Sequence, residues 1–442
     1  MSSATDSQLF GGRCRVAPAP RLEGELSLPG DKSISHRALN FSALSSGTQR
    51  LAGLSRGADV AATADALRAL GVPVRDGEVV EVGQPEGGVL SAPAAALNCG
   101  NSGTSMRLLS GLLAAQPFTS TLSGDASLCR RPMLRVVAPL RAMGARIEGQ
   151  DEGRLAPLTI YGGALEGIEH YSQVASAQVK SALLLAGLFA EGRTVVHEPH
   201  LSRDHSERML AACGVSVESF EGGVAMEGGQ TLDAPERLSV PGDISAAAFF
   251  LVAAALLPGS DLLISGVGVN PTRTGILDVL AAAGARVERV DERHEAGEPV
   301  ADLRVRGGEL HAFDVGESLV PRLIDELPVL AVLAARAHGT SSITGAAELR
   351  AKESDRIEST VNMLRLLGVA VETRADGMLI EGCGGRPFEG GVQISAAGDH
   401  RIAMSAAVAA LVARAPVEIL GSDAVHTSFP DFFQQLERCS GR

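Results

Sequence analysis

The sequence has few lysines, few aromatic residues and few cysteines. Among its 442 residues, only Lys32, Lys180 and Lys352 are lysines, so almost every basic residue is an arginine. Trp is absent and aromatic residues make up 3% of the chain, whereas 45% of the residues are hydrophobic and 51 are glycine. This composition argues against disorder and favours a compact α/β protein of small-residue helices and tight turns. The length is sufficient for two or three domains with substantial cores.

The six cysteines are scattered and show no CxxC spacing; they are Cys14, Cys99, Cys129, Cys213, Cys383 and Cys439. This pattern indicates free thiols in a reducing compartment. The stretch 1–20 lacks the apolar core of a signal peptide, and the apolar run 246–257 is too short to span a membrane. We therefore expect a cytoplasmic protein.

Several common catalytic motifs are also missing. The sequence has no GxxxxGK[ST] loop, no GxGxxG after an expected strand and no GxSxG turn. These absences argue against a P-loop, a dinucleotide fold and a hydrolase triad, although Asp399 and His400 are adjacent. His197, His200 and His205 lack the helical HExxH spacing, so we interpret them as structural. We expect neither a metal nor a cofactor.

The net charge of −13 argues against non-specific binding of nucleic acids or anionic membranes, but a local basic cluster can still attract a small anion. The lysines lie in three polar segments, 30–37, 176–181 and 349–356, that lead into or open helical runs. Helix starts bind anions, so the three segments together predict a shared anion site. Each segment alone could equally be a solvated helix face.

In the third segment, the spacing of Lys352, Glu353 and Arg356 predicts two cations and one carboxylate on one helical face.

An internal repeat organises the chain. A helix end, a glycine and an alternating apolar strand recur five times, and the glycines are Gly71, Gly144, Gly214, Gly284 and Gly368. Glycine at this position suits a left-handed helix C-cap, and the β-branched residues that follow predict strands. A sixth copy is cut by the end of the chain at 432–442. The repeat places most charged candidates at equivalent helix starts, where aligned dipoles would sum their positive ends.

Two near copies of one segment mark the domain boundaries. Residues 26–31 and 238–243 both contain Pro-Gly-Asp after an alternating apolar stretch, which suits a crossover. We predict a discontinuous domain of residues 1–29 and 241–442 and an inserted domain of residues 30–240, with three repeats in each.

Two further segments favour anion recognition. Residues 98–107 form a small-residue turn before a helix, with exposed N–H groups and little steric bulk. Arg130 and Arg131 precede Pro132, and their guanidinium forks suit a carboxylate or phosphate. Taken singly, the first segment could be an ordinary helix cap and the second two surface arginines.

Together, these segments resemble the 5-enolpyruvylshikimate-3-phosphate synthase family of enolpyruvyl transferases, from about residue 21 to residue 436. The resemblance rests on LPGDKSISHR at 28–37, GNSGT at 100–104, RP at 131–132, SAQVKSA at 176–182, RAKESDR at 350–356 and DHR at 399–401. The fourth segment and SRDH at 202–205 look like the second sequence class of that family.

The resemblance implies two inside-out α/β barrel-like domains, each of three βαβαββ repeats, that close over two substrates. Phosphoenolpyruvate would be bound by Lys32, Asn101, Gly103, Arg131, Arg356 and Arg401. Shikimate 3-phosphate would be bound by Lys32, Ser33, Arg37, Ser176, Gln178, Arg203, Asp325 and Lys352. The catalytic residues would be Asp325, Glu353 and Lys32.

The implied reaction belongs to the shikimate pathway of aromatic amino acid biosynthesis. The enolpyruvyl group of phosphoenolpyruvate is transferred to the 5-hydroxyl of shikimate 3-phosphate through a tetrahedral intermediate, and phosphate leaves. Glu353 would carry the proton of the methylene carbon and Asp325 that of the hydroxyl, with Lys32 as an alternative carrier. The cations beside Glu353 favour its charged form, so its protonation would require bound phosphoenolpyruvate. The commoner sequence class has a lysine before the final Phe-Pro, whereas 425–430 has none.

Two alternatives remain at this stage. The related UDP-N-acetylglucosamine enolpyruvyl transferase would have Lys-Asn at Lys32-Ser33 and a cysteine at Ala126. A non-catalytic anion-binding protein on the same scaffold would not need Asp325, Glu353 and Lys32 together. We expect a monomeric transferase that binds small molecules and neither nucleic acid nor membrane.

Overall fold

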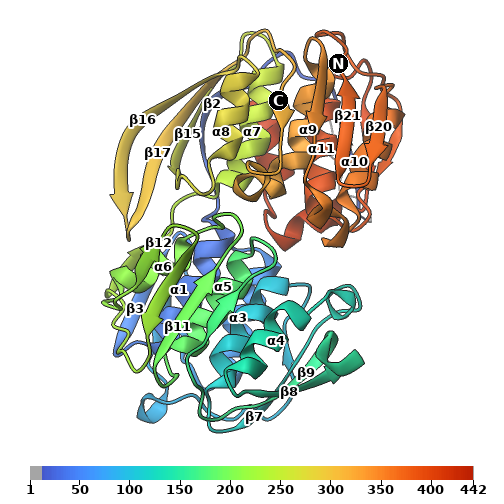
Figure 1. Ribbon diagram of the computed structural model, residues 1–442. Coiled ribbons are helices and arrows are strands. Elements are labelled where there is room, and N and C mark those ends of the chain that lie inside the picture. Colours follow the sequence, from blue (N-terminus) through green and yellow to red (C-terminus); the bar gives the residue numbers. More distant parts are fainter. Residues whose placement is uncertain (1–11, 442) are drawn as a thin grey trace. The chain divides into compact units, whose positions relative to one another are not determined.

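The computed structural model describes residues 12–441, which form two compact units. Unit 1 contains residues 12–29, 242–293 and 299–441, and unit 2 contains residues 30–241 and 294–298. Figure 1 shows both units with their elements labelled. The chain therefore enters unit 2 after Pro29 and returns to unit 1 after Pro241. No helix in the described part of the chain is long and apolar enough to cross a bilayer.

Unit 2 is built from three repeats of a sheet and two helices. Its helices are α1 (Lys32–Leu44), α2 (Ala58–Ala69), α3 (Gly103–Ala114), α4 (Leu134–Ala142), α5 (Ala177–Gly187) and α6 (His205–Ala212). Its strands are β3 (Thr48–Ala52), β4 (Val74–Arg75), β5 (Val79–Gly83), β6 (Leu97–Asn98), β7 (Thr119–Ser123), β8 (Arg146–Gln150), β9 (Leu155–Tyr161), β10 (Glu169–Tyr171), β11 (Arg193–His197), β12 (Glu218–Phe220), β13 (Gly223–Glu227) and β14 (Arg237–Ser239). They form sheets in the orders β14-β3-β5-β4, β6-β7-β9-β8 and β10-β11-β13-β12.

Unit 1 repeats the same plan. Its helices are α7 (Ile244–Leu256), α8 (Gly275–Ala282), α9 (Leu327–Arg336), α10 (Arg356–Leu366), α11 (His400–Ala410) and α12 (Phe432–Cys439). Its strands are β1 (Arg13–Val16), β2 (Glu23–Ser27), β15 (Asp261–Gly268), β16 (Arg286–Glu295), β17 (Glu298–Arg306), β18 (Asp314–Val315), β19 (Thr340–Ile343), β20 (Val371–Arg374), β21 (Gly377–Glu381), β22 (Gln393–Ser395) and β23 (Val417–Leu420). The sheets have the orders β16-β17-β15-β2, β18-β19-β21-β20 and β1-β23-β22.

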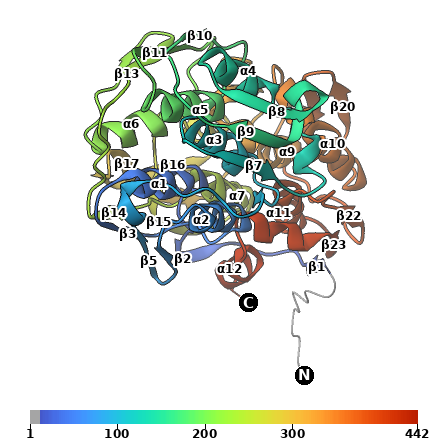
Figure 2. The same cartoon turned by 90° about the horizontal axis from the view of Figure 1, so that it is seen from below.

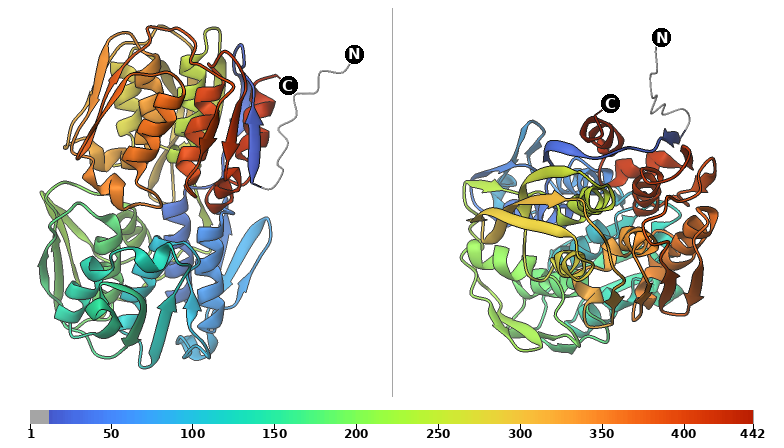
Figure 3. Two further views of the ribbon diagram at one scale, coloured as in Figure 1. Left: turned by 90° about the vertical axis from the view of Figure 1, so that its right-hand side faces the viewer. Right: turned by 90° about the horizontal axis from the view of Figure 1, so that it is seen from above.

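Each of the two strands that link the units pairs within one unit and leads into a helix of the other. Strand β2 leads into α1 of unit 2 but pairs in parallel with β15 of unit 1, whereas β14 leads into α7 of unit 1 but pairs in parallel with β3 of unit 2. Strand β1 pairs antiparallel with β23, beside the C-terminal strands (Figure 3). Strand β1 thus joins the sheet of the last repeat, whereas β2 joins the sheet of β15. The tip of the β16–β17 hairpin, residues 294–298, belongs to unit 2, a feature that the sequence repeats do not predict.

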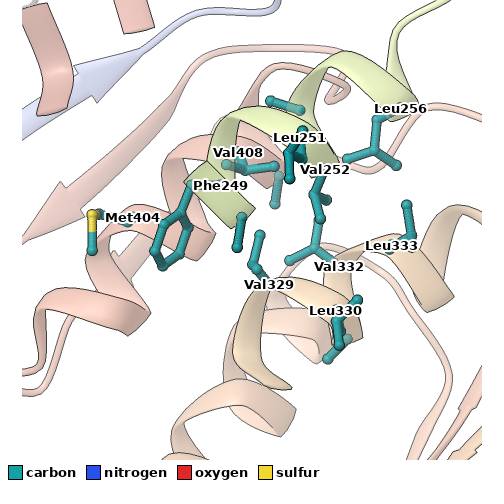
Figure 4. Close-up of a cluster of buried hydrophobic side chains, with 14 of the residues drawn as sticks. Phe249, Leu251, Val252, Leu256, Val329, Leu330, Val332, Leu333, Met404 and Val408 are labelled. Carbon is teal, nitrogen blue, oxygen red and sulfur yellow. The ribbon is translucent and has the colours of Figure 1, made fainter. Parts of the chain in front are cut away.

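The first helix of each repeat lies inside its unit. All thirteen residues of α7 are buried, and α3, α9 and α11 are buried on almost every side. The strands instead alternate between buried and exposed residues, so each sheet has one face toward the helices and one toward solvent. Figure 4 shows how Phe249, Val332 and Val408 from α7, α9 and α11 meet in the core of unit 1. The expected inside-out α/β fold is therefore confirmed.

The five repeat glycines have the backbone that the sequence predicts. Their φ angles lie between 80° and 102°, in the left-handed region that glycine adopts without steric cost. Gly441, which follows α12, has a φ of 72°, which also lies in the left-handed region. The sixth copy therefore ends in the same helix cap as the other five.

Helices α3 and α5 pack unusually closely in the middle of unit 2 (Figure 2). A Cβ atom added at Gly111 of α3 would lie 2.1 Å from the carbonyl oxygen of Ala182 on α5. No real Cβ contact is that short, so the crossing requires glycine at this position.

Replacing Gly111 with Ala should therefore destabilise unit 2, although alanine is the better helix former. We expect a loss of about 1–3 kcal/mol or more in the free energy of unfolding, because backbone must move to admit the methyl group. Urea denaturation followed by circular dichroism would measure the loss. Gly163→Ala is a matched control, since its Cβ would meet nothing within 4 Å. Equal midpoints for the two variants would contradict the close helix crossing.

Candidate active site

Helix α1 begins at Lys32, one of the predicted site residues. Asp31 caps the helix, because its Oδ1 accepts a hydrogen bond from the Ile34 amide at 2.9 Å. The Lys32 ammonium lies 2.9 Å from Oδ2 of Asp59, which belongs to the first turn of α2. This ion pair joins the starts of α1 and α2.

Ser33 connects two of the predicted arginines. Arg37 donates from Nη1 to the Ser33 carbonyl at 2.8 Å, and Arg203, before α6, donates from Nη1 to the Ser33 hydroxyl at 3.5 Å. Burial lowers the pKa of Arg37 to about 10, although the carboxylate of Glu207 acts in the opposite direction. Arg37 therefore stays protonated at neutral pH and contributes a buried positive charge.

Asn101 and Arg131 form a second part of the site in unit 2. Arg131 donates from Nη2 to the amide oxygen of Asn101, and Asn101 donates from Nδ2 to Asp125 at 2.7 Å. Gly103 opens α3, and a Cβ there would lie 2.8 Å from Nη1 of Arg107. The glycine thus leaves room for a guanidinium beside the helix start.

Gln178 joins the starts of α5 and α3. It donates from Nε2 to the Thr104 hydroxyl at 2.9 Å and accepts at Oε1 from Nη1 of Arg107 at 2.6 Å. Ser176 caps α5. Arg107 was not among the predicted ligands, yet it is buried beside Gln178 and Gly103. Its spacing of four residues from Gly103 on one helix was the signal that could have identified it.

These contacts bring the helix starts of unit 2 together. Besides the pairs above, the Ser105 hydroxyl on α3 donates to the backbone oxygen of Asp59 on α2 at 3.2 Å. The starts of α1, α2, α3, α5 and α6 and the segment before α4 are therefore linked in one network. All nine predicted residues of unit 2 lie at these helix starts, where the backbone N–H groups and the basic side chains favour anions.

In unit 1, Arg356 is the centre of the predicted site. Its guanidinium is buried and donates to Asp399 from Nε at 2.7 Å and from Nη2 at 3.3 Å. Nη1 donates to Oδ1 of Asp325 at 3.0 Å, and Nη2 donates to Oε2 of Glu353 at 2.6 Å. Both expected acid–base carboxylates thus bind the same guanidinium.

Lys352 and Arg401 complete this group. The Lys352 ammonium lies 3.7 Å from Oδ1 of Asp325, and Arg401 donates from Nη1 to the Asp325 backbone oxygen at 3.0 Å. All five predicted residues of unit 1 are therefore close together. One premise was wrong: α10 begins only at Arg356, after its cap Asp355, so Lys352 and Glu353 lie in a turn and not on a helical face.

The charges around Arg356 reinforce one another. Burial alone would lower the pKa of Arg356, but Asp399, Glu353 and Asp325 raise it above its ordinary value. Burial would raise the pKa of Asp399, but the Arg356 guanidinium lowers it below its ordinary value. Asp399 therefore remains ionised and pairs with Arg356, and the sequence-based suggestion of an Asp399–His400 pair misses this partner.

A second buried network of unit 1 was not predicted. Glu326 is completely buried, and its Oε1 accepts a hydrogen bond from the Ser245 hydroxyl. Arg273 donates to the same hydroxyl from Nη2 at 2.6 Å, and Nη1 of Arg401 lies 4.0 Å from Oε1 of Glu326. This network links the starts of α7 and α9 and the segment before α8 to Arg401.

The third lysine does not fit the prediction of a shared anion site. Lys180 is buried between Glu198 and Glu207, and each carboxylate lies 2.7 Å from its ammonium. An ammonium removed from water must be paired, and these two carboxylates supply the pairing within unit 2. The prediction failed because the sequence spacing does not show that both glutamates fold onto α5.

Two of the three histidines of the 197–205 segment bind carboxylates. His197 lies 2.9 Å from Glu169, and His205 lies 2.7 Å from Glu298 at the hairpin tip. Within residues 12–441, no group of three or more His, Cys, Asp or Glu side chains is arranged to hold a metal ion. All six cysteines are free thiols.

Comparison with known proteins places the chain in one family. The family model for EPSP synthase (3-phosphoshikimate 1-carboxyvinyltransferase) matches residues 16–436. The 3-phosphoshikimate 1-carboxyvinyltransferase of Citrifermentans bemidjiense is 53% identical over 423 residues, covering 96% of this chain and 98% of the relative. That of Gloeobacter violaceus is 53% identical over 432 residues, covering 97% and 99%.

Solved structures show the same likeness. The EPSP synthase of Acinetobacter baumannii is 44% identical with a TM-score of 0.86, and the match covers 97% of this chain and 98% of that one. The enolpyruvyl transferase NikO of Streptomyces tendae, 18% identical with a TM-score of 0.78 over 96% of each chain, shares the fold. With the family match spanning nearly the whole chain and relatives above 50% identity, the chain belongs to the EPSP synthase family of enzymes.

Proposed function

We propose that this chain transfers the enolpyruvyl group of phosphoenolpyruvate to the 5-hydroxyl of shikimate 3-phosphate and releases phosphate. The family and the relatives' names support this reaction. We further propose that the enzyme acts as a monomer in the cytoplasm. One chain carries every residue assigned below, and its phosphorylated substrates do not cross membranes unaided.

We propose binding roles that follow the family motifs. The phosphoenolpyruvate ligands are Lys32, Asn101, Gly103, Arg131, Arg356 and Arg401. The shikimate 3-phosphate ligands are Lys32, Ser33, Arg37, Ser176, Gln178, Arg203, Asp325 and Lys352. Their cations offset the charge of two polyanionic substrates, and their fixed hydrogen bonds orient them before the substrates arrive.

The reaction has two chemical steps. First, the acceptor oxygen bonds to the central carbon of phosphoenolpyruvate, Asp325 takes the hydroxyl proton, and Glu353 donates a proton to the methylene carbon. Then the carbon–oxygen bond to phosphate breaks, the methyl group returns a proton to Glu353, and the hydroxyl proton leaves with the phosphate. The vinyl ether and inorganic phosphate account for every atom. Lys32 is the alternative carrier for either proton.

One observation of the structure carries this assignment. Asp325 and Glu353 are held 3.0 Å and 2.6 Å from Nη1 and Nη2 of a single buried guanidinium, that of Arg356. Two carboxylates fixed by one rigid fork can serve neighbouring atoms of one substrate. A protein that only bound anions would not need two carboxylates in its anion site, because they repel the ligand.

A phosphate-release assay with two competing acceptors tests the function. We expect release when phosphoenolpyruvate is mixed with shikimate 3-phosphate and none with UDP-N-acetylglucosamine, because the family motif at Lys32-Ser33 is that of the shikimate enzyme. Release only with the UDP-sugar would assign the related transferase instead. Binding of shikimate 3-phosphate in calorimetry without release in either mixture would indicate a non-catalytic protein.

Replacing Glu353 with Gln tests the proton transfer. The amide keeps the shape but cannot donate a proton to carbon, so we expect kcat to fall by about 100- to 10,000-fold. The rate of phosphate release at saturating substrate gives kcat. The dissociation constant of shikimate 3-phosphate in calorimetry should stay within about threefold of wild type, a difference below about 1 kcal/mol. Glu358→Gln is the matched control, since Glu358 lies on α10 and pairs with the peripheral Arg350 at 3.5 Å. Normal turnover in Glu353→Gln would remove this residue from the chemistry.

A further inference from the structure

Lys180 is a buried cation that the proposed reaction does not use. It lies on α5, two residues after Gln178, and its side chain is 2% exposed. Lysines are almost never fully buried without partners, because an unpaired ammonium in the interior is very costly. Glu198 and Glu207 pair with it, each at 2.7 Å. These three residues, Lys180, Glu198 and Glu207, form what we call the lysine cluster.

The lysine cluster stands next to the residues that hold Arg37. Ser181 follows Lys180 on α5, Ser206 precedes Glu207 on α6, and the two serine oxygens lie 2.7 Å apart. Arg37 donates from Nη2 to Ser181 at 2.6 Å and from Nε to Ser206 at 2.7 Å. Two adjacent cross-links therefore join α5 and α6: the serine pair that orients Arg37 and the Lys180–Glu207 pair beside it.

The lysine cluster also restrains the loop of Arg203. Glu198 directly follows β11, and its Oε2 accepts hydrogen bonds from the Lys180 ammonium at 2.7 Å and from the Ser202 amide at 3.4 Å. Ser202 directly precedes Arg203, which reaches Ser33 on α1. A single ammonium thus connects to both arginines assigned to shikimate 3-phosphate, through α6 on one side and through the loop on the other.

The charge balance of the lysine cluster depends on Lys180. The cluster holds two carboxylates for one ammonium, and the second oxygens, Oε1 of Glu198 and Oε2 of Glu207, have no hydrogen-bond partner among residues 12–441. Burial raises the pKa of Glu207, while Lys180 acts to lower it. Glu207 is also the carboxylate with the largest effect on Arg37. Without Lys180, an ionised Glu207 would attract the Arg37 guanidinium away from the serine pair.

We propose that Lys180 is a positioning residue for recognition of the phosphorylated acceptor. By neutralising Glu207 and Glu198, it keeps Arg37 on Ser181 and Ser206 and holds the Arg203 loop, so that both guanidiniums face the anion. The inference rests on the proposed function, because it concerns the binding of shikimate 3-phosphate. It assigns Lys180 a role in affinity for one substrate and none in bond breaking.

The Lys180→Met variant tests the proposal. We expect KM for shikimate 3-phosphate, and its dissociation constant in calorimetry, to rise by about 10- to 100-fold, because a misplaced ligand group of this kind has effects of that size. KM for phosphoenolpyruvate and kcat should stay within about threefold of wild type, a change of under 1 kcal/mol. Unchanged values for shikimate 3-phosphate in a folded variant would overturn the proposal.

Two further variants, which remove carboxylate charges from the lysine cluster, separate the charge effect of Lys180 from its packing. K180M/E198Q keeps only Glu207 charged, whereas K180M/E198Q/E207Q removes that charge as well. We expect the double variant to bind shikimate 3-phosphate weakly and the triple variant to recover most of the affinity, since nothing then attracts Arg37. Equal affinities would overturn the proposal. This pair also keeps the test available if Lys180→Met alone fails to fold.

Leu184→Ala is the packing control, because Leu184 is buried one turn after Lys180 on α5. We expect it to lower the melting temperature and to leave KM for shikimate 3-phosphate unchanged. A rise in KM equal to that of Lys180→Met would show that any weakening of α5 impairs binding and would overturn the specific role of Lys180. A wild-type chain that neither binds shikimate 3-phosphate nor releases phosphate would instead overturn the proposed function and this inference with it.

Discussion

The buried guanidinium of Arg356 determines how unit 1 arranges its charged groups. A charge removed from water must be compensated, and this one meets Asp399, Asp325 and Glu353 at distances between 2.6 and 3.3 Å. The three carboxylates come from three different segments, so the single cation fixes the starts of α10 and α11 and the turn before α9 relative to one another. Side chains suited to acid–base chemistry are thereby held in place by a cation of the chain itself.

Unit 2 also contains buried arginines, but their hydrogen-bond partners differ from those of Arg356. Its arginines Arg37, Arg107 and Arg131 donate to serine hydroxyls, amide oxygens and backbone carbonyls. A neutral acceptor of this kind orients a guanidinium without cancelling its charge. We propose that the carboxylates of unit 1 exchange protons and that the cations of unit 2 bind phosphate. On this proposal, the two units contribute different chemistry although they repeat one plan of helices and sheets.

Much of the fold and most of the candidate site could be predicted from the sequence. The repeat glycines predicted the helix ends, because a left-handed cap leaves a local sequence signature. The expected helix starts in turn predicted where the charged site residues lie. Long-range partners left no such signature. The pairing of Lys180 with Glu198 and Glu207, and of Arg356 with Asp399, depends on tertiary packing. The helical spacing of Lys352 and Glu353 led to a wrong prediction, because α10 begins only at Arg356, after its cap Asp355.

The inside-out arrangement would let a chain so poor in lysine carry the anion site that we propose. Helices built from Ala, Leu and Gly pack inside each unit, and their starts then gather at one end, where backbone N–H groups supply part of the positive field. Arginine suits such a place, because its planar fork is oriented by several fixed acceptors at once. A lysine ammonium is compact and makes its contacts at a single point. It is therefore useful where one charge must pair with two carboxylates, as Lys180 does, and this pairing is the basis of the positioning role that we propose for Lys180.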